Sequence, residues 1–476
     1  MTNPLDNHGA SVQTVSPDTA IPKKQEPLRR LLFDCTHVFN VHWMNTGIQR
    51  VVRNVANELP VQWCGQECIP VTFAGGKFHR VLHLLPDDPV SRSVPARFVA
   101  WLQNMNDDLW NRYSQSEKTQ LGLAETIKRG FLIARCHALY RPLLLSKWLV
   151  KSFGPGYDTF QSRTRPLKVT EHDSLVLLDS SWNVEGFRAH VESLKQRGVR
   201  IATVVYDLIP IATPQYCTQG LVTLFEEWFE WACHWSDGFA CISRSVCDDL
   251  RKEVERRIGA HEAGRRTYGY FHLGSELDLK NASAAKDEGL DAVFSGGHPV
   301  FLAVSTIEPR KNHDYLLDAF ELVWAAGSKA KLCIVGRVGW KCDDFMERAT
   351  KHPELRKRLF MFNSLNDNGL EYAYAKASAL IFPSFAEGFG LPLVEAMQRG
   401  LPAIASDLPV FREVGGDYLC YCDPHDPKTC AAIISEFEKT GKIPGAKPLD
   451  DWKWIGWKQS TIQLLEAASG KQPGVN

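Results

Sequence analysis

The sequence predicts a protein of the α/β class with two domains, in which buried strands alternate with helices. Its 476 residues exceed one typical domain and suit two domains of roughly 200 residues each. In the N-terminal half, an apolar run at 31–34 is followed by a helical pattern at 47–59. A second alternation begins at Val300, after a turn-rich stretch at 285–298. We therefore place the domain boundary in that stretch.

The remaining elements follow in chain order. Residues 1–27 have no periodicity and contain several prolines, so we expect a disordered lead-in before the fold begins at about Leu28. Strands are expected at 174–179, 201–206 and 238–242, each followed by a loop and a helical pattern. We assign 28–290 to the first domain, with an insert at about 80–170, 298–448 to the second domain, and 449–476 to closing helices and a tail. Open parallel sheets bind ligands beyond the carboxyl ends of their strands, so we expect one crevice between the domains.

The composition excludes some partners and cofactors. Lysine plus arginine equals aspartate plus glutamate at 55 each, so there is no overall field that would attract nucleic acid. Thirteen cysteines without a C-x-x-C pair or a secretory leader indicate reduced thiols in a cytoplasmic protein, and we expect Cys233, Cys241 and Cys333 in the core. The sequence has no D-x-D and no His/Cys cluster of metal-site spacing, so we expect no metal and no cofactor.

A membrane contact is one interpretation of residues 131–153. No apolar run in the chain reaches the 18 or more residues that a membrane-spanning helix needs. Residues 131–153 mix Leu, Phe and Trp with four basic residues, which suits a helix on the inner face of the cytoplasmic membrane. A pair of domain helices that bury the same apolar stripe is the alternative.

The segment 381–400, IFPSFAEGFGLPLVEAMQRG, carries the strongest indication of chemistry. A short apolar run at 379–383 suits a buried strand, and the proline at 392 is acceptable just inside the start of a helix. Gly388 and Gly390 allow the backbone to approach a ligand, and the free amides of Gly390 and Leu391 can bind an anion. Glu387 lies in the loop and Glu395 one turn into the helix. An ordinary strand, turn and helix with two solvated glutamates is the alternative for this motif alone.

These residues resemble the E-x7-E signature of the retaining glycosyltransferases of family 4. The resemblance continues through FLAVSTIEPRKNH at 301–313, LCIVGR at 332–337, GLPAIASD at 400–407 and FREVG at 411–415, so it covers residues from about 300 to 425 in order and spacing. It implies the GT-B fold, in which two Rossmann-like βαβ domains face a central cleft and C-terminal helices cross back to the first domain.

The resemblance also implies roles for the charged residues. Arg310 and Lys311 would grip a diphosphate and stabilise it as the leaving group, Arg310 through its planar fork and Lys311 as a point charge. A surface Arg-Lys pair is the alternative. Glu395 would accept hydrogen bonds from ribose hydroxyls, and Glu387 would face the donor sugar. Many relatives have an arginine after the glycine at the end of the 301–305 strand, where this chain has Ser305 and Thr306.

Other candidates lie on neighbouring loops. A helix N-terminus at Thr46 and Gly47 would point at the diphosphate. Asp207, in YDLIP, would orient an acceptor or donor hydroxyl, or else cap the following turn. The predicted catalytic residues are thus Glu387, Arg310, Lys311 and Asp207, and the predicted donor-binding residues are Gly47, Gly336, Arg337, Ser364, Gly388, Phe389, Gly390, Leu391 and Glu395.

The predicted function is that of a retaining, metal-independent glycosyltransferase. It would move a hexose or deoxyhexose from a nucleotide-diphosphate sugar to a glycan or lipid-linked acceptor in bacterial surface polysaccharide synthesis, lipopolysaccharide or capsule. A nucleotide-sugar epimerase with the same fold is one alternative, and it would form product without an acceptor. A non-catalytic nucleotide-sugar-binding protein is another, which the joint presence of both glutamates and the Arg-Lys pair disfavours.

Overall fold

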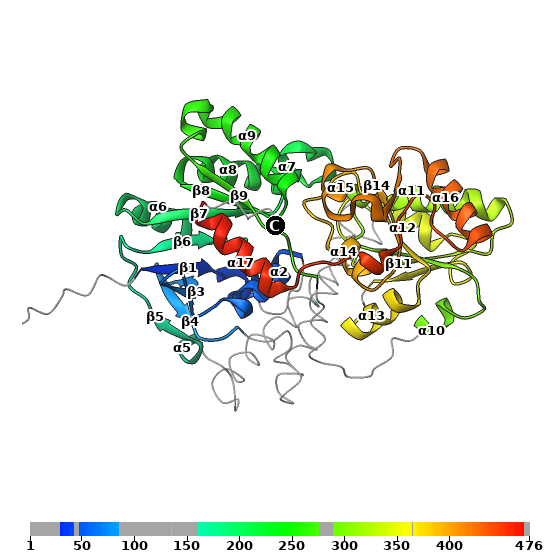
Figure 1. Cartoon of the computed structure of the whole chain (residues 1–476), viewed down its shortest axis with the longest axis horizontal. Coiled ribbons are helices and arrows are strands. Elements are labelled where there is room, and N and C mark those ends of the chain that lie inside the picture. The colour runs from blue at the N-terminus through cyan, green and yellow to red at the C-terminus, as the bar shows by residue number, and fades with distance from the viewer. Residues whose placement is uncertain are drawn as a thin grey trace, which may run out of the picture.

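Two sheets of parallel strands lie side by side along the long axis of the molecule (Figure 1). The structure, a computed structural model, describes residues 29–41, 47–84, 135, 160–275, 289–363 and 365–470. The expected lead-in at 1–27, Thr46, Ser364 and most of the expected insert lie outside the described residues. The same holds for the segment at 131–153 apart from Arg135, so its two interpretations remain open.

The first sheet has the strand order β5-β4-β3-β1-β6-β7-β8-β9, with β2 paired to β3. The chain passes from β1 to β3 on one side and later to β6 on the other side of β1, so the topological switch point lies between β1 and β6. Its parallel strands are β1 (Arg30–Asp34), β3 (Gln66–Ala74), β6 (Ser174–Leu177), β7 (Arg200–Val205), β8 (Gly238–Cys241) and β9 (Thr267–Tyr270). Its antiparallel edge strands are β2 (Gln62–Trp63), β4 (Lys77–Val81) and β5 (Thr164–Pro166).

The edge strands refine the insert that the sequence predicts. Arg80 pairs with Arg165 across β4 and β5, so both ends of the 80–170 segment belong to the first sheet. The chain leaves the sheet after β4 and returns to the same edge at β5. The insertion proper therefore lies between these two strands.

Two sequence features account for helices of the first half: a capping residue at the start of the helix, or apolar residues at helical spacing that form one buried face. The helix predicted at 47–59 is confirmed as α2, which buries Val51, Val52 and Val55. Thr218 and Ser243 accept hydrogen bonds from the first turns of α8 and α9. The helices are α1 (Thr36–Asn40), α2 (Gly47–Glu58), α5 (Phe160–Arg163), α6 (Phe187–Gln196), α7 (Ile209–Ala212), η2 (Pro214–Tyr216), α8 (Gln219–Trp235) and α9 (Arg244–Ala263).

The second sheet is parallel throughout, with the order β12-β11-β10-β13-β14-β15. Its central strands are buried along their whole length because helices cover both faces. The strands are β10 (Val300–Val304), β11 (Lys331–Val335), β12 (Leu359–Phe362), β13 (Ala379–Phe382), β14 (Ala403–Ser406) and β15 (Leu419–Cys422). The helices are α10 (Leu290–Val293), η4 (Pro309–Lys311), α11 (His313–Ala325), α12 (Asp343–Thr350), α13 (Asp367–Lys376), α14 (Leu391–Gln398), α15 (Pro409–Gly415), η5 (Gly416–Tyr418), α16 (Pro427–Thr440) and η6 (Leu449–Asp451).

The last helix, α17 (Trp457–Ala468), returns to the first half and packs against α2, β8 and β9, as the red helix of Figure 1 shows. Two glycines permit this approach. A Cβ on Gly269 would lie 2.8 Å from Cα of Ala467, and one on Gly274 would lie 2.6 Å from the amide nitrogen of Trp457. The prediction that a C-terminal helix crosses back to the first domain is confirmed.

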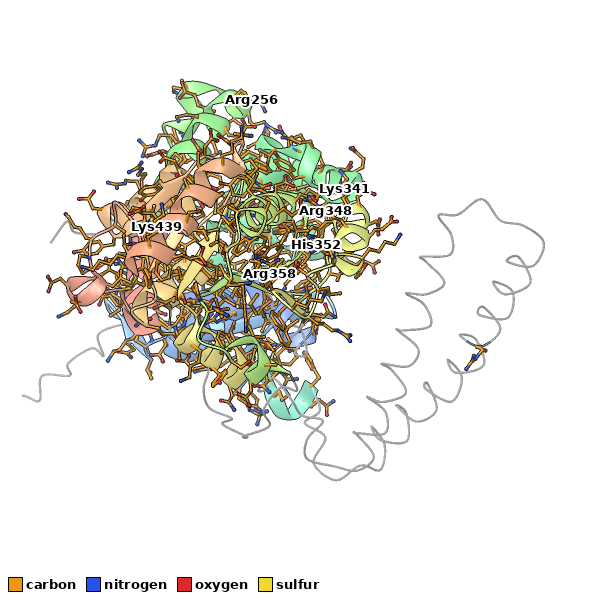
Figure 2. The ribbon with its side chains drawn as sticks, turned by 90° about the vertical axis from the view of Figure 1, so that its right-hand side faces the viewer. Arg256, Lys341, Arg348, His352, Arg358 and Lys439 are labelled. Atoms are coloured by element: carbon orange, nitrogen blue, oxygen red, sulfur yellow. The ribbon has the colours of Figure 1, made fainter. Side chains whose placement is uncertain are left out.

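The outer face of the second half carries mixed charge. Figure 2 shows Arg348, His352 and Arg358 on this face, and Arg348 donates to Asp318 at 2.6 Å and to Glu321 at 2.9 Å. In the interior, the cysteines at 233, 241 and 333 are fully buried, so their predicted place in the core is confirmed. Within the described ranges, none of the helices is long and apolar enough to cross a bilayer, and no cluster of ligand residues could hold a metal ion.

Candidate active site

The loop between β13 and α14 forms the centre of the candidate site. β13 ends at Phe382, and α14 begins at Leu391 with Pro392 in its first turn, as the sequence predicts. Gly390 has φ of +97°, and a Cβ there would lie 2.8 Å from the ring of Phe411. Only glycine therefore suits this turn, which leads into the first amides of α14.

Arg310 and Lys311 both bind Glu387, so three of the four predicted catalytic side chains lie together. The ammonium of Lys311 forms a short ion pair with one oxygen of Glu387, and Arg310 Nη1 lies 3.0 Å from the other. Arg310 also donates to Glu308 at 2.6 Å and to the backbone oxygen of Ala386 at 2.6 Å. The exposed fractions of the Arg310, Lys311 and Glu387 side chains are 15%, 11% and 9%, so their charges are shielded from bulk water.

Asn312 holds the cations in place. It adopts a left-handed conformation with φ of +59° at the end of η4, a conformation that asparagine tolerates better than most residues. Its side-chain amide donates to the backbone oxygens of Pro383 at 3.3 Å and Pro424 at 2.9 Å. Because Pro383 begins the loop that carries Glu387, these bonds fix the two cations relative to that carboxylate.

The charges of this cluster shift the acidity of its members. Burial disfavours the ionised form of Glu387, but Arg310 and Lys311 outweigh it and lower the pKa of Glu387 to about 2. Burial lowers the pKa of Lys311, and the adjacent Arg310 lowers it further. Glu387 therefore stays ionised at neutral pH. It is a poor general base, but a fixed negative charge beside the two cations.

The first half meets this loop at the end of β7. A Cβ on Gly388 would lie 2.2 Å from the backbone oxygen of Tyr206 and 3.1 Å from Cβ of Asp207, and Ser243 Oγ donates to the backbone oxygen of Gly388 at 2.9 Å. Asp207 accepts from the amide of Ile209 at 3.0 Å, so it caps the following turn, as the alternative interpretation expected. Burial raises its pKa while Arg310 opposes the shift, so Asp207 also lies within the field of the cluster.

Glu395 binds a residue that the sequence reasoning missed. Arg50, on α2 of the first half, forms a short ion pair with Oε1 of Glu395, and the hydroxyl of Tyr374 donates to Oε2 at 2.8 Å. The side chain of Glu395 is 3% exposed and that of Arg50 is 16% exposed. The only sequence signal for Arg50 is its position three residues after Gly47, beside the buried valine stripe of α2.

The remaining donor-binding candidates are distributed around the cluster. A Cβ on Gly336 would lie 1.7 Å from the backbone oxygen of Ser305, so this glycine allows the loops after β10 and β11 to pack. Arg337 is exposed, and none of the described contacts joins it to Glu387 or Glu395. Gly47 is exposed at the start of α2, whereas the Phe389 side chain is buried near Trp454, with ring centroids 5.8 Å apart. Only the backbone of Phe389 is thus available to a ligand.

Two further contacts close the halves against each other. Trp340 Nε1 donates to the backbone oxygen of Tyr216 at 2.8 Å, and the ring of Tyr216 stacks on Phe385 with centroids 5.3 Å apart. Glu413 of α15 accepts from the amides of Arg244 at 2.7 Å and Ser245 at 2.9 Å, at the N-terminus of α9. The structure is therefore a closed arrangement of the two halves.

Two aspartates lie at the switch point of the first sheet. Asp34 is the last residue of β1 and accepts from Ser181 Oγ at 2.7 Å, and Asp179 lies two residues after β6 and accepts from the amide of Val38 at 2.7 Å. Burial raises the pKa of both carboxyls, and the charge of Asp179 raises the pKa of Asp34 further. The sequence analysis did not select them, although each lies at the carboxyl end of an apolar strand.

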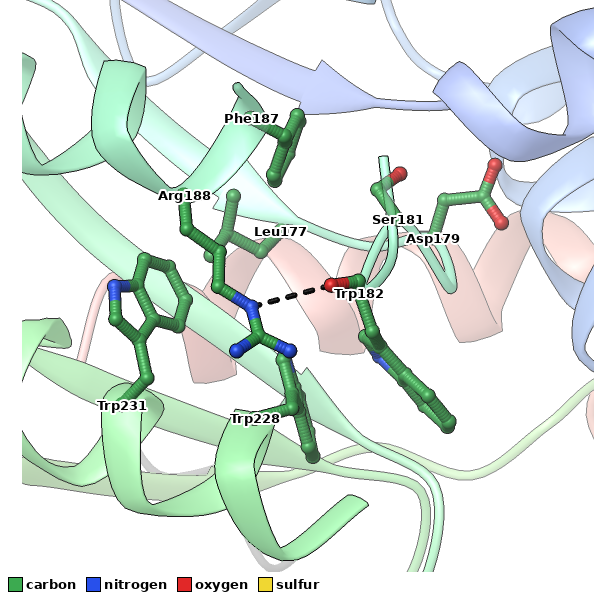
Figure 3. A pocket seen from close by; sticks show the side chains of 8 residues that line it. All are labelled: Leu177, Asp179, Ser181, Trp182, Phe187, Arg188, Trp228 and Trp231. Atoms are coloured by element: carbon green, nitrogen blue, oxygen red, sulfur yellow. Dashed lines mark hydrogen bonds between the residues drawn. The ribbon is translucent and has the colours of Figure 1, made fainter. Parts of the chain in front are cut away.

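A small pocket lies beside this pair (Figure 3). Its empty space of about 260 Å³ includes open solvent, and Arg188 crosses it to donate to the backbone oxygen of Trp182 at 3.1 Å. The lining side chains are Leu177, Asp179, Ser181, Trp182, Phe187, Arg188, Trp228 and Trp231. Because this space is partly open to solvent and is crossed by the Arg188 side chain, it is small for a substrate site.

Two parallel α/β sheets that face each other, with helix N-termini, cations and carboxylates between them, define a protein of the GT-B class. Residues 291–447 match the family described as glycosyl transferases group 1. These residues, about a third of the chain, are thus similar to that family, in agreement with the family resemblance inferred from the sequence.

Several relatives are named as mannosyltransferases. The chain is 32% identical over 305 residues to the serotype-specific mannosyltransferase WbdA of Escherichia coli. The matched region covers 63% of this chain and 37% of that protein. It is 27% identical over 317 residues to O-antigen chain mannosyltransferase B of Escherichia coli, covering 64% of this chain and 81% of the relative. The chain thus spans little more than a third of the length of WbdA.

The chain also resembles solved structures at low identity. Sucrose-phosphate synthase from Thermosynechococcus elongatus is 15% identical, with a TM-score of 0.47, covering 92% of this chain and 94% of that one. An α,α-trehalose-phosphate synthase from Burkholderia vietnamiensis is 12% identical, with a TM-score of 0.49, covering 94% and 97%.

Proposed function

We propose that this chain is a retaining, metal-independent glycosyltransferase that moves a hexose or deoxyhexose from a nucleotide-diphosphate sugar to a glycan or lipid-linked acceptor. The observation that carries the proposal is the cluster of Arg310, Lys311 and Glu387 beside the N-terminus of α14. A diphosphate needs positive charge and free amide donors at one place, and this arrangement offers both.

Mannose is the first candidate for the transferred sugar. The relatives from Escherichia coli are named as mannosyltransferases, two of them of a serotype or an O-antigen chain. The acceptor would then be a growing surface glycan or its lipid-linked precursor. We expect the reaction in the cytoplasm, at the inner face of the cytoplasmic membrane, where such precursors would be extended.

The chemistry follows from the charges of the site. The bond between the anomeric carbon and the diphosphate oxygen breaks, and the leaving group gains negative charge that Arg310 and Lys311 stabilise. The acceptor oxygen attacks from the same face and forms the new glycosidic bond, so the anomeric configuration is retained. Its proton passes to the departing phosphate oxygen, because Glu387, with its pKa lowered to about 2, is a poor base.

A ligand panel tests the proposal. UDP-, GDP-, ADP- and dTDP-sugars are added to the whole chain and the melting temperature is recorded, since a ligand at 100 times its Kd adds about 2.7 kcal/mol to the folded state. We expect one nucleotide to raise the melting temperature. Lys311→Ala should lose this response, while the control Lys351→Ala should keep it, because Lys351 forms an exposed pair with Glu347.

Two outcomes would overturn the proposal. If none of the nucleotide sugars shifts the melting temperature, the cluster does not serve a donor. If a responding nucleotide sugar is converted to a new sugar nucleotide without any acceptor, the protein is an epimerase. Release of nucleoside diphosphate that depends on an added glycan acceptor supports transfer.

A further inference from the structure

The carboxylate expected to bind ribose is already occupied. Glu395 is held by Arg50 from the facing half and by the hydroxyl of Tyr374. A carboxylate oxygen that accepts a guanidinium cannot offer its full capacity to a sugar hydroxyl at the same time. Ribose hydroxyls that bind Glu395, which is 3% exposed, would therefore compete with Arg50 for this carboxylate.

The displaced guanidinium would stay close to the expected diphosphate position. Glu395 lies four residues after Leu391, so it is one helical turn, about 5.4 Å, from the first amides of α14. Side chains lean toward the N-terminus of their helix, which brings the Glu395 carboxylate nearer still to these amides. Arg50 lies in the first turn of α2 and leans toward the N-terminus of α2 for the same reason. Its long side chain allows the guanidinium to reorient while the backbone of α2 stays in place.

The charge balance of the site gives a reason for this exchange. Among the described residues, Arg310 and Lys311 pair with Glu387, Arg310 also pairs with Glu308, and Arg50 pairs with Glu395. The cations are thus matched by three carboxylates before any donor arrives. A diphosphate brings further negative charge, and a charge that leaves water must be paired. Ribose hydroxyls are neutral, so when they take Glu395 they release one cation for the diphosphate.

We propose that Arg50 is a donor-binding residue that exchanges partners: it pairs with Glu395 in the empty site and with the donor diphosphate once the ribose hydroxyls take Glu395. This inference rests on the proposed function. It makes the first half of the chain a contributor to donor binding, and it makes closure of the two halves part of diphosphate recognition.

The exchange predicts opposite effects on two ligands. The probes are the nucleoside diphosphate that responds among GDP, UDP, ADP and dTDP, and the matching nucleoside, which has the same ribose or deoxyribose but no phosphate. In Arg50→Met the nucleoside should bind severalfold tighter, because it no longer competes with the guanidinium. The nucleoside diphosphate should bind about tenfold weaker or worse, because a charge-assisted contact is lost. Titration calorimetry measures both affinities.

Tyr374→Phe is the matched control. It removes the other partner of Glu395 without removing a positive charge. Both ligands should therefore change affinity by the same factor, and the ratio of the two dissociation constants should stay as in the parent protein. Arg50→Lys keeps the positive charge but loses the planar guanidinium. Its affinity for the nucleoside diphosphate should lie between those of the parent and of Arg50→Met.

The outcomes separate the inference from the function. If the parent protein binds none of the four nucleoside diphosphates, the proposed function fails. If the parent binds one, but Arg50→Met changes nucleoside and nucleoside diphosphate affinity by the same factor or changes neither, the exchange is wrong and the function stands. Equal circular dichroism spectra of the variants show that the comparison is made between folded proteins.

Discussion

Buried acids in the two halves of the molecule differ in their partners. In the second half, Arg310 and Lys311 are paired with Glu387, so positive and negative charges alternate over a few ångströms. In the first half, Asp34 and Asp179 are satisfied by hydroxyl groups and backbone amides. Glu387 is thus held by cations, whereas the two acids of the first half are held by neutral donors. Arg50 links the two halves, because it is a cation of the first half that pairs with Glu395 of the second.

Loss of Lys311 should have the largest effect on activity, because it disrupts the cluster of Arg310, Lys311 and Glu387. In Lys311→Ala, Glu387 remains buried with only Arg310 as partner, and the leaving group loses one of its stabilising charges. We expect kcat to fall by about 10²–10³, the usual loss when one electrostatic donor is removed from an active site. Turnover of the responding nucleotide sugar measures this, with Lys351→Ala as the control. A fall of less than a few-fold would remove Lys311 from the catalytic set.

Gly388→Ala should separate the two halves without touching a charge. The added Cβ would lie 2.2 Å from the backbone oxygen of Tyr206, so the halves must move apart to accept it. Misplacement by about 1 Å costs up to roughly 10² in rate, and we expect a loss of this order in kcat/KM. Binding of the nucleoside diphosphate, monitored by thermal shift, should also weaken, because the contact of Arg50 depends on how the halves meet.

Gly220→Ala is the control for this prediction. Gly220 lies in the first turn of α8, and a Cβ there would meet nothing within 4 Å. It should leave kcat/KM unchanged. Equal losses in the two variants would contradict the role assigned to the contact between the halves.

The aspartates of the first half should show a pH dependence of stability. Their pKa values are raised by burial, so the folded state keeps protons that the unfolded chain releases. The stability that they contribute is present below the ordinary carboxyl range and is lost as pH rises through the raised values. Asp34→Asn should remove this loss. The difference in free energy of unfolding between the variant and the parent should therefore shift in favour of the variant, by on the order of 2 kcal/mol, from about pH 5 to pH 8.

Denaturant unfolding at the two pH values measures this difference. The exposed Asp417→Asn, whose partner is Lys447 on the surface, is the control and should show no such gain. If Asp34→Asn were less stable than the parent by the same amount at both pH values, the carboxyl would act only as an ionised acceptor.

The smallest effect is expected on the outer face of the second half. Arg348 contacts Asp314, Asp318 and Glu321, but these partners are 44–61% exposed and the pairs are screened by water and salt. Arg348→Ala should change the free energy of unfolding by about 0–1 kcal/mol and leave kcat unchanged. A larger loss of activity would show that charge outside the cleft also contributes to donor binding.

The second half could be predicted from the sequence because its site residues lie in two contiguous segments. Arg310 and Lys311 follow one strand, and Glu387 follows the neighbouring strand of the same parallel sheet, so their meeting follows from the order of strands. The turn at Gly390 and the helix after it could also be predicted, because glycine and proline are typical of such a turn and helix start. The roles assigned to these residues in donor binding stay predictions.

The first half was less predictable because its contacts join distant parts of the chain. Arg50 meets Glu395 across 345 positions, and no local pattern announces a pairing that depends on how two domains face each other. Asp34 and Asp179 did leave a signal, an acid at the carboxyl end of each apolar strand, but such acids are common at strand ends. Their proximity depends on the switch point between β1 and β6, which requires the sheet order.

The return of α17 to the first half has a consequence for synthesis of the chain. The surface of β8, β9 and α2 that α17 covers is complete at Tyr270, but its cover begins only at Trp457, about 190 residues later. At about 5–20 residues per second, a ribosome needs on the order of 10–40 s to make the intervening chain. During that interval the nascent first half exposes an apolar face, which makes it a natural client for a chaperone until the last helix emerges and docks.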